Sequence, residues 1–258
     1  MTDFDPSKPN VARVYDALRD GKDNFEADRE AAAAMRQMAA DAKKIAHDNR
    51  AFLGRAVQFL AAEAGISQFL DIGSGMPAEE NTHEIAVRVR PASRVAYLDN
   101  DPVVLGHARA VLADESTSIA LLGDLRKPRE FLGDLALREF IDFGQPVGVL
   151  LLAVLHFIEE PLARSAVHTL MRELPSGSYL VISHASGDQA TPEEIATVNA
   201  IYEKMGTPIF LRSRDEITAL FDGLEMIPPG VVDMSAWQNP EYELARTIGY
   251  AGVARKTE

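Results

Sequence analysis

The spacing of apolar residues divides the chain into two parts. In residues 1–65, apolar side chains recur at helical intervals, which is typical of amphipathic helices. We expect one helix over 11–18 that stops before Gly21, a second from about Glu26, and a third that begins near Asp48 or Asn49 and ends at Gly65. The sequence therefore predicts an N-terminal helical cap over residues 1–65.

From Gln68 onward, short apolar runs alternate with helical stretches. This pattern is typical of βα units and predicts an α/β, Rossmann-like, doubly wound and mostly parallel sheet. The predicted strands are 68–72, 94–98, 118–122, 147–153 and 179–183, followed by 224–227 and 247–254. The last two runs are joined by Pro228-Pro229-Gly230 without an obvious crossover helix, so we expect antiparallel pairing at a sheet edge. Residues 66–258 should form one compact unit with the cap.

Several helix starts are marked by local capping signals. Asn81 precedes Glu84 by three residues, Asp101 precedes Pro102, Thr191-Pro192 precedes Glu194, and Ser213 precedes Glu216. Such side chains accept hydrogen bonds from the free N–H groups of a first helical turn, and proline suits the first helical position. We expect helices to begin at these four places.

Composition narrows the class of protein. The formal net charge of the 258 residues is −13, and a field of that sign disfavours nucleic acid and anionic membrane surfaces as partners. The chain has no cysteine, so disulfides and thiolate chemistry are excluded, and the dispersed histidines offer no metal-ligand spacing. No segment approaches the ~20 apolar residues of a membrane span. We expect a cytoplasmic protein without a metal site.

The strongest chemical signal is a glycine turn directly after the first predicted strand. Asp71 ends the apolar run, and Gly73, Ser74 and Gly75 follow. Glycines at this place let the backbone approach a ligand where side chains would collide, which indicates a nucleotide-like cofactor. A glycine pair after a strand can also be plain turn chemistry, and the match to a dinucleotide fingerprint is weak by itself.

Two later strands also end in carboxylates. Asp99 lies 24 residues beyond Gly75, where an acidic residue can accept hydrogen bonds from ribose hydroxyls; alternatively, Asp99 only begins a turn and Asp101 caps the next helix. Asp124 can accept the exocyclic amino group of an adenine, with neighbouring leucines such as Leu125 over the ring. Because parallel strands end at one rim, the three acidic strand ends predict a shared ligand site.

In order and spacing, these three motifs resemble those of class I S-adenosylmethionine-dependent methyltransferases. More narrowly, residues 9–16, 21–25, 28–29 and 153–157 look like a bacterial S-adenosyl methyltransferase family long filed as a domain of unknown function. The resemblance covers nearly the whole chain. It departs at residues 17–21, where Ala-Leu-Arg-Asp-Gly stands in place of a Tyr-Leu-Gly-Gly-like stretch.

The resemblance implies a seven-stranded sheet whose last strand is antiparallel, and S-adenosyl-L-methionine as the cofactor. By the same resemblance the glycine loop holds the methionine part, Asp99 the ribose, and Asp124 with Leu125 the adenine. Asn100 and Ala153, within matched motifs, are also expected at the cofactor. Residues 66–258 would then be the cofactor-binding domain.

Two further groups of residues are candidates for the site. Tyr15, Asn24 and Arg29 combine aromatic, amide and basic groups in one N-terminal stretch, which suggests a lid over the methionine end; ordinary helix packing explains them equally well. His156 follows the fourth predicted strand and is either a general base or a residue that hydrogen-bonds the backbone and shapes the pocket. His184 is a weaker candidate of the same kind.

The function that these observations favour is methyl transfer from S-adenosylmethionine to an acceptor, which we expect to be a small molecule. An NAD(P)-binding oxidoreductase would share the glycine turn and the acidic strand end, but the sequence shows no catalytic Tyr/Lys or His/Asp set for it. A non-catalytic S-adenosylmethionine-binding protein is the other alternative.

Overall fold

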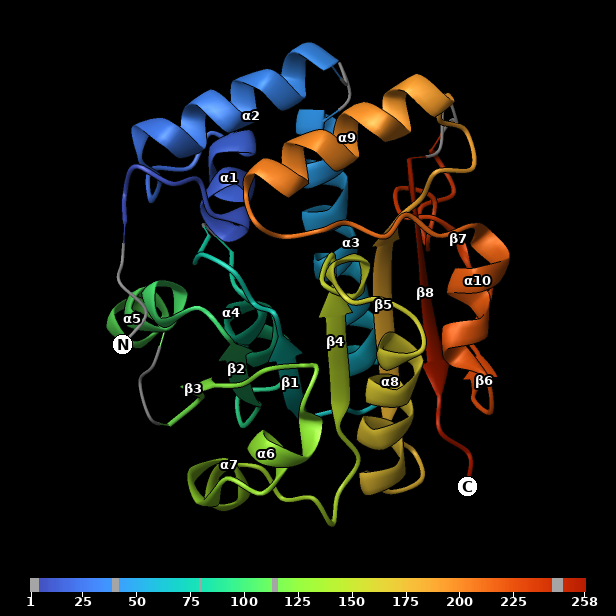
Figure 1. Cartoon of the computed structure of the whole chain (residues 1–258). Coiled ribbons are helices and arrows are strands. Elements are labelled where there is room, and N and C mark those ends of the chain that lie inside the picture. The colour runs from blue at the N-terminus through green and yellow to red at the C-terminus, as the bar shows by residue number, and fades with distance from the viewer. Residues whose placement is uncertain (1–4, 39–41, 79, 113–115, 243–247) are drawn as a thin grey trace.

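A single mixed sheet organises the molecule (Figure 1). The computed structural model describes residues 5–38, 42–78, 80–112, 116–242 and 248–258. The parallel strands are β1 (Gln68–Ile72), β2 (Arg94–Asp99), β3 (Ser118–Leu122), β4 (Gly148–Leu152) and β5 (Tyr179–Ala185), in the order β3-β2-β1-β4-β5. The C-terminal strand β8 (Gly249–Arg255) pairs antiparallel with β5.

The α/β class, the parallel sheet and its antiparallel C-terminal side confirm the prediction from the sequence. Within the described ranges the sheet has eight strands rather than seven, because two short strands, β6 (Glu225–Met226) and β7 (Val232–Asp233), both pair with β8. Pro228-Pro229-Gly230 lies between β6 and β7, and because both strands run antiparallel to β8, the chain keeps its direction along this edge of the sheet. Observed and predicted strand ends agree to within two residues, except that Thr247 lies outside the described residues.

The sheet is covered on both faces. On one face lie α3 (Ala42–Ala62), α4 (Thr82–Val89) and α5 (Pro102–Val111). On the other lie α6 (Pro128–Leu132), α7 (Leu135–Phe140), α8 (Leu162–Glu173) and α10 (Arg214–Thr218). Within β1, Leu70 and Ile72 join one core cluster and Phe69 joins the other, because successive strand side chains point to opposite faces.

A helical cap lies over the carboxyl ends of the parallel strands. It consists of α1 (Val11–Leu18), α2 (Glu26–Met38), the beginning of α3, and α9 (Pro192–Lys204), which contacts α2 from a distant part of the sequence (Figure 1). Val14, Leu18 and Met35 form its core, against which Ile201 and Tyr202 pack. The cap therefore combines N-terminal helices with a helix that follows β5.

The four capping signals are confirmed, and one predicted helix start is wrong. Capping boxes begin α4, α9 and α10, and the Asp101 side chain accepts a hydrogen bond from Val103 N in α5. Helix α3 does not begin near Asp48 or Asn49 but already at Ala42. Asp48 instead forms an i,i+4 ion pair with Lys44, and Asn49 is buried, so neither side chain caps a helix.

In the described part of the chain, no helix combines the length and apolar character needed to cross a membrane.

Candidate active site

A cavity of about 1070 Å³ lies between the cap and the carboxyl ends of the parallel strands. Most of the residues predicted for the site line it, namely Tyr15, Asp71, Gly73, Ser74, Gly75, Asp99, Asn100, Asp124, Leu125, Ala153 and His156. Asn24 and Arg29 are not among the lining residues. The three acidic strand ends and the glycine loop therefore border one space.

The glycine loop after β1 depends on backbone conformations that favour glycine. Gly73 and Gly75 have φ values of +72° and +66°, in the left-handed region that costs other residues energy. The N–H of Gly73 donates to the carbonyl of Leu98 at 2.7 Å. A Cβ on Gly73 would lie 2.5 Å from Cγ2 of Val154, whereas a Cβ on Gly75 would have nothing within 4 Å. The loop thus packs tightly at Gly73 and leaves open space at Gly75.

The carboxylate of Asp99 ties the glycine loop to the loop after β2. Its Oδ2 accepts a hydrogen bond from the N–H of Gly75 at 3.0 Å, and its Oδ1 accepts one from the N–H of Asp101 at 3.0 Å. Burial raises the pKa of Asp99, and these backbone hydrogen bonds oppose that rise. Asp99 therefore begins a turn, as one of the two interpretations of the sequence proposed. It also borders the cavity, as the other interpretation requires.

Asp71 lies buried beneath the loop. Its Oδ2 accepts a hydrogen bond from Thr82 Oγ1 at 2.6 Å, which fastens the start of α4 to the end of β1. Burial raises the pKa of Asp71, while the Thr82 hydroxyl and the positive charge of Arg50 lower it. No local pattern along the chain indicates that Thr82 and Arg50 support this carboxylate, since both contacts arise only in the folded chain.

Asp124 lies at the end of the cavity formed by the loop after β3. Both of its oxygens accept hydrogen bonds from the Arg126 guanidinium, with N–O distances of 2.8 to 3.1 Å. Burial raises the pKa of Asp124, but the hydrogen bonds and charge of Arg126 outweigh burial and leave the pKa below its ordinary value. Asp124 is therefore ionised at neutral pH. Leu125 is buried beside it.

The loop also contains a polar atom that lacks a protein partner. Ser74 Oγ is buried and makes no hydrogen bond within the described residues. A buried hydroxyl without a partner is costly, on the order of 1–3 kcal/mol. Because Ser74 borders the cavity, this hydroxyl and the open space at Gly75 suit a ligand with polar groups near the loop.

The N-terminal candidates separate into two groups. Tyr15 borders the cavity, where its hydroxyl donates to Ala46 O at 3.0 Å and accepts from Asn49 Nδ2 at 2.8 Å. Asn24 instead donates to the buried carboxylate of Asp16 at 2.8 Å, and Arg29 donates to Asn24. Asn24 and Arg29 therefore shape the connection between α1 and α2 and do not themselves line the cavity.

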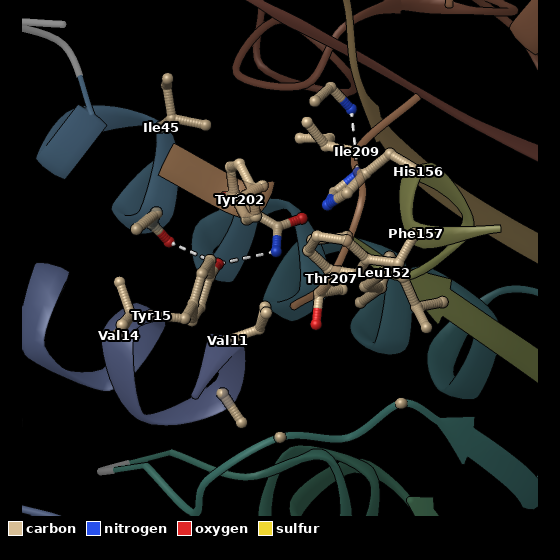
Figure 2. A pocket seen from close by; sticks show the side chains of 18 of the residues that line it. Val11, Val14, Tyr15, Ile45, Leu152, His156, Phe157, Tyr202, Thr207 and Ile209 are labelled. Atoms are coloured by element: carbon tan, nitrogen blue, oxygen red, sulfur yellow. Dashed lines mark hydrogen bonds between the residues drawn. The ribbon is translucent and has the colours of Figure 1, made fainter. Parts of the chain in front are cut away.

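His156 points into the cavity from the 3-10 helix η1 (Leu155–Phe157) that follows β4 (Figure 2). Its Nδ1 accepts a hydrogen bond from the backbone N–H of Ala185 at 3.3 Å. Burial, followed by the nearby His184 and Arg212, holds the pKa of His156 well below its ordinary value. The imidazole is therefore neutral near pH 7, and because Nδ1 accepts, its proton is on Nε2.

Arg212 supports η1 without lining the cavity, and His184, which itself borders the cavity, contacts Arg212. Arg212 is buried, and its guanidinium donates to Leu155 O at 2.9 Å, to Ile158 O at 2.6 Å and to His184 Nε2 at 2.6 Å. His184 Nδ1 in turn donates to Ala185 O at 2.7 Å. Burial lowers the pKa of His184 to about 4. Sequence reasoning missed Arg212, which lies in a segment without helical or strand periodicity.

Figure 2 also shows an aromatic and apolar wall around His156. The ring of Phe157 lies 4.3 Å from the His156 ring and 5.6 Å from the Tyr202 ring, measured between centroids. Val11, Val14, Ile45, Leu152 and Ile209 complete this side of the cavity. The cavity thus has a polar side at the glycine loop and an apolar side beneath the cap.

The chain is similar to known proteins over nearly its whole length. The family model of S-adenosyl methyltransferases matches residues 1–257. A crystal structure of a candidate methyltransferase from Thermobifida fusca YX is 40% identical, with a TM-score of 0.92 over 99% of this chain and 97% of that one. A DUF574 family protein from Streptomyces avermitilis MA-4680 is 38% identical, with a TM-score of 0.92 over 98% of this chain and 99% of that one.

More distant structures share the fold alone. Mitomycin 7-O-methyltransferase is 17% identical, with a TM-score of 0.52 over 98% of this chain and 74% of that one. A search of curated proteins gives no match. On the family model and the two close structures, the chain belongs to the S-adenosyl methyltransferase family.

Proposed function

We propose that this enzyme transfers the methyl group of S-adenosylmethionine to a small-molecule acceptor, and that cofactor and acceptor share the cavity beneath the cap. The observation that carries the proposal is the division of this one cavity into a polar side at the glycine loop and an apolar side around His156. Its volume of about 1070 Å³ lies just above the usual range for small-molecule sites, which leaves room for two ligands.

The polar side suits the cofactor. The open space at Gly75 and the Ser74 hydroxyl without a partner are available to the amino-acid part. The carboxylate of Asp99 already accepts hydrogen bonds from two backbone N–H groups. It lies where ribose hydroxyls can donate further hydrogen bonds to it. The ionised Asp124 can accept from the amino group of adenine, because a carboxylate offers about four lone-pair sites and Arg126 leaves some of them free.

The bound cofactor supplies a methyl group that is already activated on a sulfonium. The protein then has to align the acceptor with this methyl group and exclude water, and such positioning can supply ~7 kcal/mol or more of barrier reduction. The rings of Tyr15, Phe157 and Tyr202 all border the cavity and can pack against a flat acceptor. Burial raises the pKa of Tyr202 to about 12, so this ring remains uncharged at neutral pH.

His156 contributes a hydrogen-bond donor to this side. With its proton on Nε2, it can hold an oxygen or nitrogen acceptor atom of the substrate in place. This geometry favours the pocket-shaping role over the general base, because a base would need the lone pair on Nε2 and therefore a proton on Nδ1, opposite the N–H of Ala185.

The cap supports the lid interpretation of the N-terminal segment for Tyr15, which borders the cavity, but not for Asn24 and Arg29. Hydrogen exchange on the full chain tests it. If the cap closes over the cofactor, S-adenosylhomocysteine should slow amide exchange in residues 10–25 and leave exchange in α8, on the opposite side of the sheet, unchanged.

The two alternative functions are less well supported. Membership in a methyltransferase family favours S-adenosylmethionine over NAD(P). A non-catalytic binding protein would have no need of a second, apolar region next to the cofactor loop.

Transfer of radiolabelled methyl groups tests the proposal directly. The enzyme is incubated with S-adenosylmethionine labelled in the methyl group and with panels of phenols, amines and carboxylic acids. We expect labelled product together with one equivalent of S-adenosylhomocysteine for at least one panel, and none with a Gly75→Val control that fills the open space of the loop. Tight cofactor binding without transfer to any panel would favour the non-catalytic alternative.

A further inference from the structure

Arg19 is a charged side chain without a counter-ion in the described structure. It directly follows α1 and borders the cavity. Its Nε is buried and has no hydrogen-bond partner within the described residues. Guanidinium groups do not lose their proton in proteins, so this donor cannot avoid the cost of burial by becoming neutral.

A second arginine lies nearby on α3. Arg50 borders the same cavity and donates to the carbonyl of Glu80 and, at 3.3 Å, to Oδ1 of Asn81. Burial lowers the pKa of Arg50, and the positive charge of Arg19 lowers it further, whereas Asp71 raises it. Two guanidinium groups therefore face one part of the cavity in a protein whose net charge is −13.

The glycine loop supplies a third donor. Ser74 Oγ, like Arg19 Nε, is buried, borders the cavity and has no partner in the described part of the chain. Two guanidinium groups and one hydroxyl can all donate hydrogen bonds. Together they match a ligand group with a negative charge and two acceptor oxygens. A carboxylate has these properties, and arginine binds carboxylates with short, charge-assisted hydrogen bonds.

We propose that Arg19, together with Arg50 and Ser74, forms a carboxylate subsite that takes the α-carboxylate of the cofactor's amino-acid part. The inference rests on the proposed function and adds Arg19 to the residues of its cofactor site. Arg19 lies in residues 17–21, where the sequence departs from the Tyr-Leu-Gly-Gly-like stretch. The ligand carboxylate replaces the missing counter-ion and relieves the repulsion between the two arginines. A carboxylate on the methyl acceptor is the other source of the same chemistry.

Binding calorimetry with two matched ligands tests the subsite. S-adenosylmethionine and decarboxylated S-adenosylmethionine differ only in the carboxylate, and both are titrated into the wild type, Arg19→Gln and Lys22→Gln. The Lys22 variant removes the same charge from an exposed side chain three residues away that does not line the cavity. Thermal unfolding checks that all three proteins are folded.

We expect Arg19→Gln to weaken binding of S-adenosylmethionine about 10-fold or more and to leave binding of the decarboxylated ligand unchanged, while Lys22→Gln changes neither. Equal loss for both ligands would show that Arg19 acts through the fold, and unchanged binding of S-adenosylmethionine would leave the acceptor as the only source of a carboxylate; either result overturns the proposal. If the wild type bound neither ligand, the proposed function itself would fail.

Discussion

The backbone N–H of Ala185 donates a hydrogen bond to Nδ1 of His156 at a distance of 3.3 Å, so the end of β5 determines which ring nitrogen of this imidazole carries the proton. The carbonyl of Ala185 accepts a hydrogen bond from Nδ1 of His184, and Nε2 of His184 accepts one from Arg212. A chain of hydrogen bonds thus runs from Arg212 through His184 and Ala185 to His156. It leaves Nε2–H of His156 as the group presented to the cavity.

Substitution of His156 distinguishes a role as hydrogen-bond donor from a role as general base. Gln can donate a hydrogen bond from its amide but cannot take up a proton, whereas Ala can do neither. With an acceptor from the methyl-transfer screen, we expect His156→Ala to lower kcat/KM about 10-fold, the equivalent of one hydrogen bond, and His156→Gln to retain most of the activity. Equal and large losses in both variants would support the general base instead.

The two buried histidines should be neutral and should carry their protons on opposite nitrogens. Long-range ¹H–¹⁵N NMR of the imidazole rings reports this directly, with His156→Gln and His184→Gln used for assignment. We expect the Nε2–H form for His156 and the Nδ1–H form for His184, because their hydrogen-bond partners require it.

Neither ring should titrate near pH 6.5. Burial lowers the pKa of His184 to about 4 and holds the pKa of His156 well below 6.5, so both rings should stay neutral at neutral pH. Titration of either ring near pH 6.5 would contradict the burial and contacts described for the pair.

Alanine at Gly73 should destabilise the fold more than alanine at Gly223, a glycine outside the loop that also has a positive φ. An alanine at Gly73 meets Val154 at 2.5 Å as well as an unfavourable φ. Gly223 has a φ of +83°, and a Cβ added to it would have no atom within 4 Å. Alanine at Gly223 therefore carries the backbone cost alone, about 1–2 kcal/mol.

Urea unfolding should therefore show a larger loss of unfolding free energy for Gly73→Ala than for Gly223→Ala. The excess should shrink in Gly73→Ala combined with Val154→Ala, which removes the colliding methyl groups. Equal losses at the two glycines would show that the contact with Val154 does not matter.

Asp124 should be specific for the amino group of adenine. We expect Asp124→Ala to weaken binding of S-adenosylhomocysteine about 10-fold, since a hydrogen bond to a charged acceptor is lost. The same substitution should barely affect S-inosylhomocysteine, whose base lacks that amino group. Calorimetry with both ligands measures the difference, and an equal effect on the two would assign Asp124 a structural role with Arg126.

The sequence was most informative where one local rule dominates. The parallel strands are continuous apolar runs, and the residues at their ends share a rim of the sheet, so the convergence of Asp71, Asp99 and Asp124 on one cavity could be predicted. Capping boxes are similarly local. For that reason α4 and α9 begin where they were expected.

The errors and omissions involve contacts between distant parts of the chain. Asn49 resembled a helix cap, but its side chain hydrogen-bonds Ser183, 134 residues away, from within α3. Arg212 and the position of α9 in the cap depend in the same way on tertiary packing. Asn24 and Arg29 were grouped with Tyr15 by proximity in sequence, but Asn24 hydrogen-bonds Asp16, Arg29 hydrogen-bonds Asn24, and neither lines the cavity.

Calorimetric titration of the wild type with S-adenosylhomocysteine and, in parallel, with NAD tests most directly whether the glycine loop and the three carboxylates form an adenosyl-sulfonium site. We predict saturable binding of S-adenosylhomocysteine at one site per chain, abolished by Gly75→Val, and no binding of NAD. A folded wild-type protein that binds NAD, or that gives no heat with S-adenosylhomocysteine, would contradict the assignment.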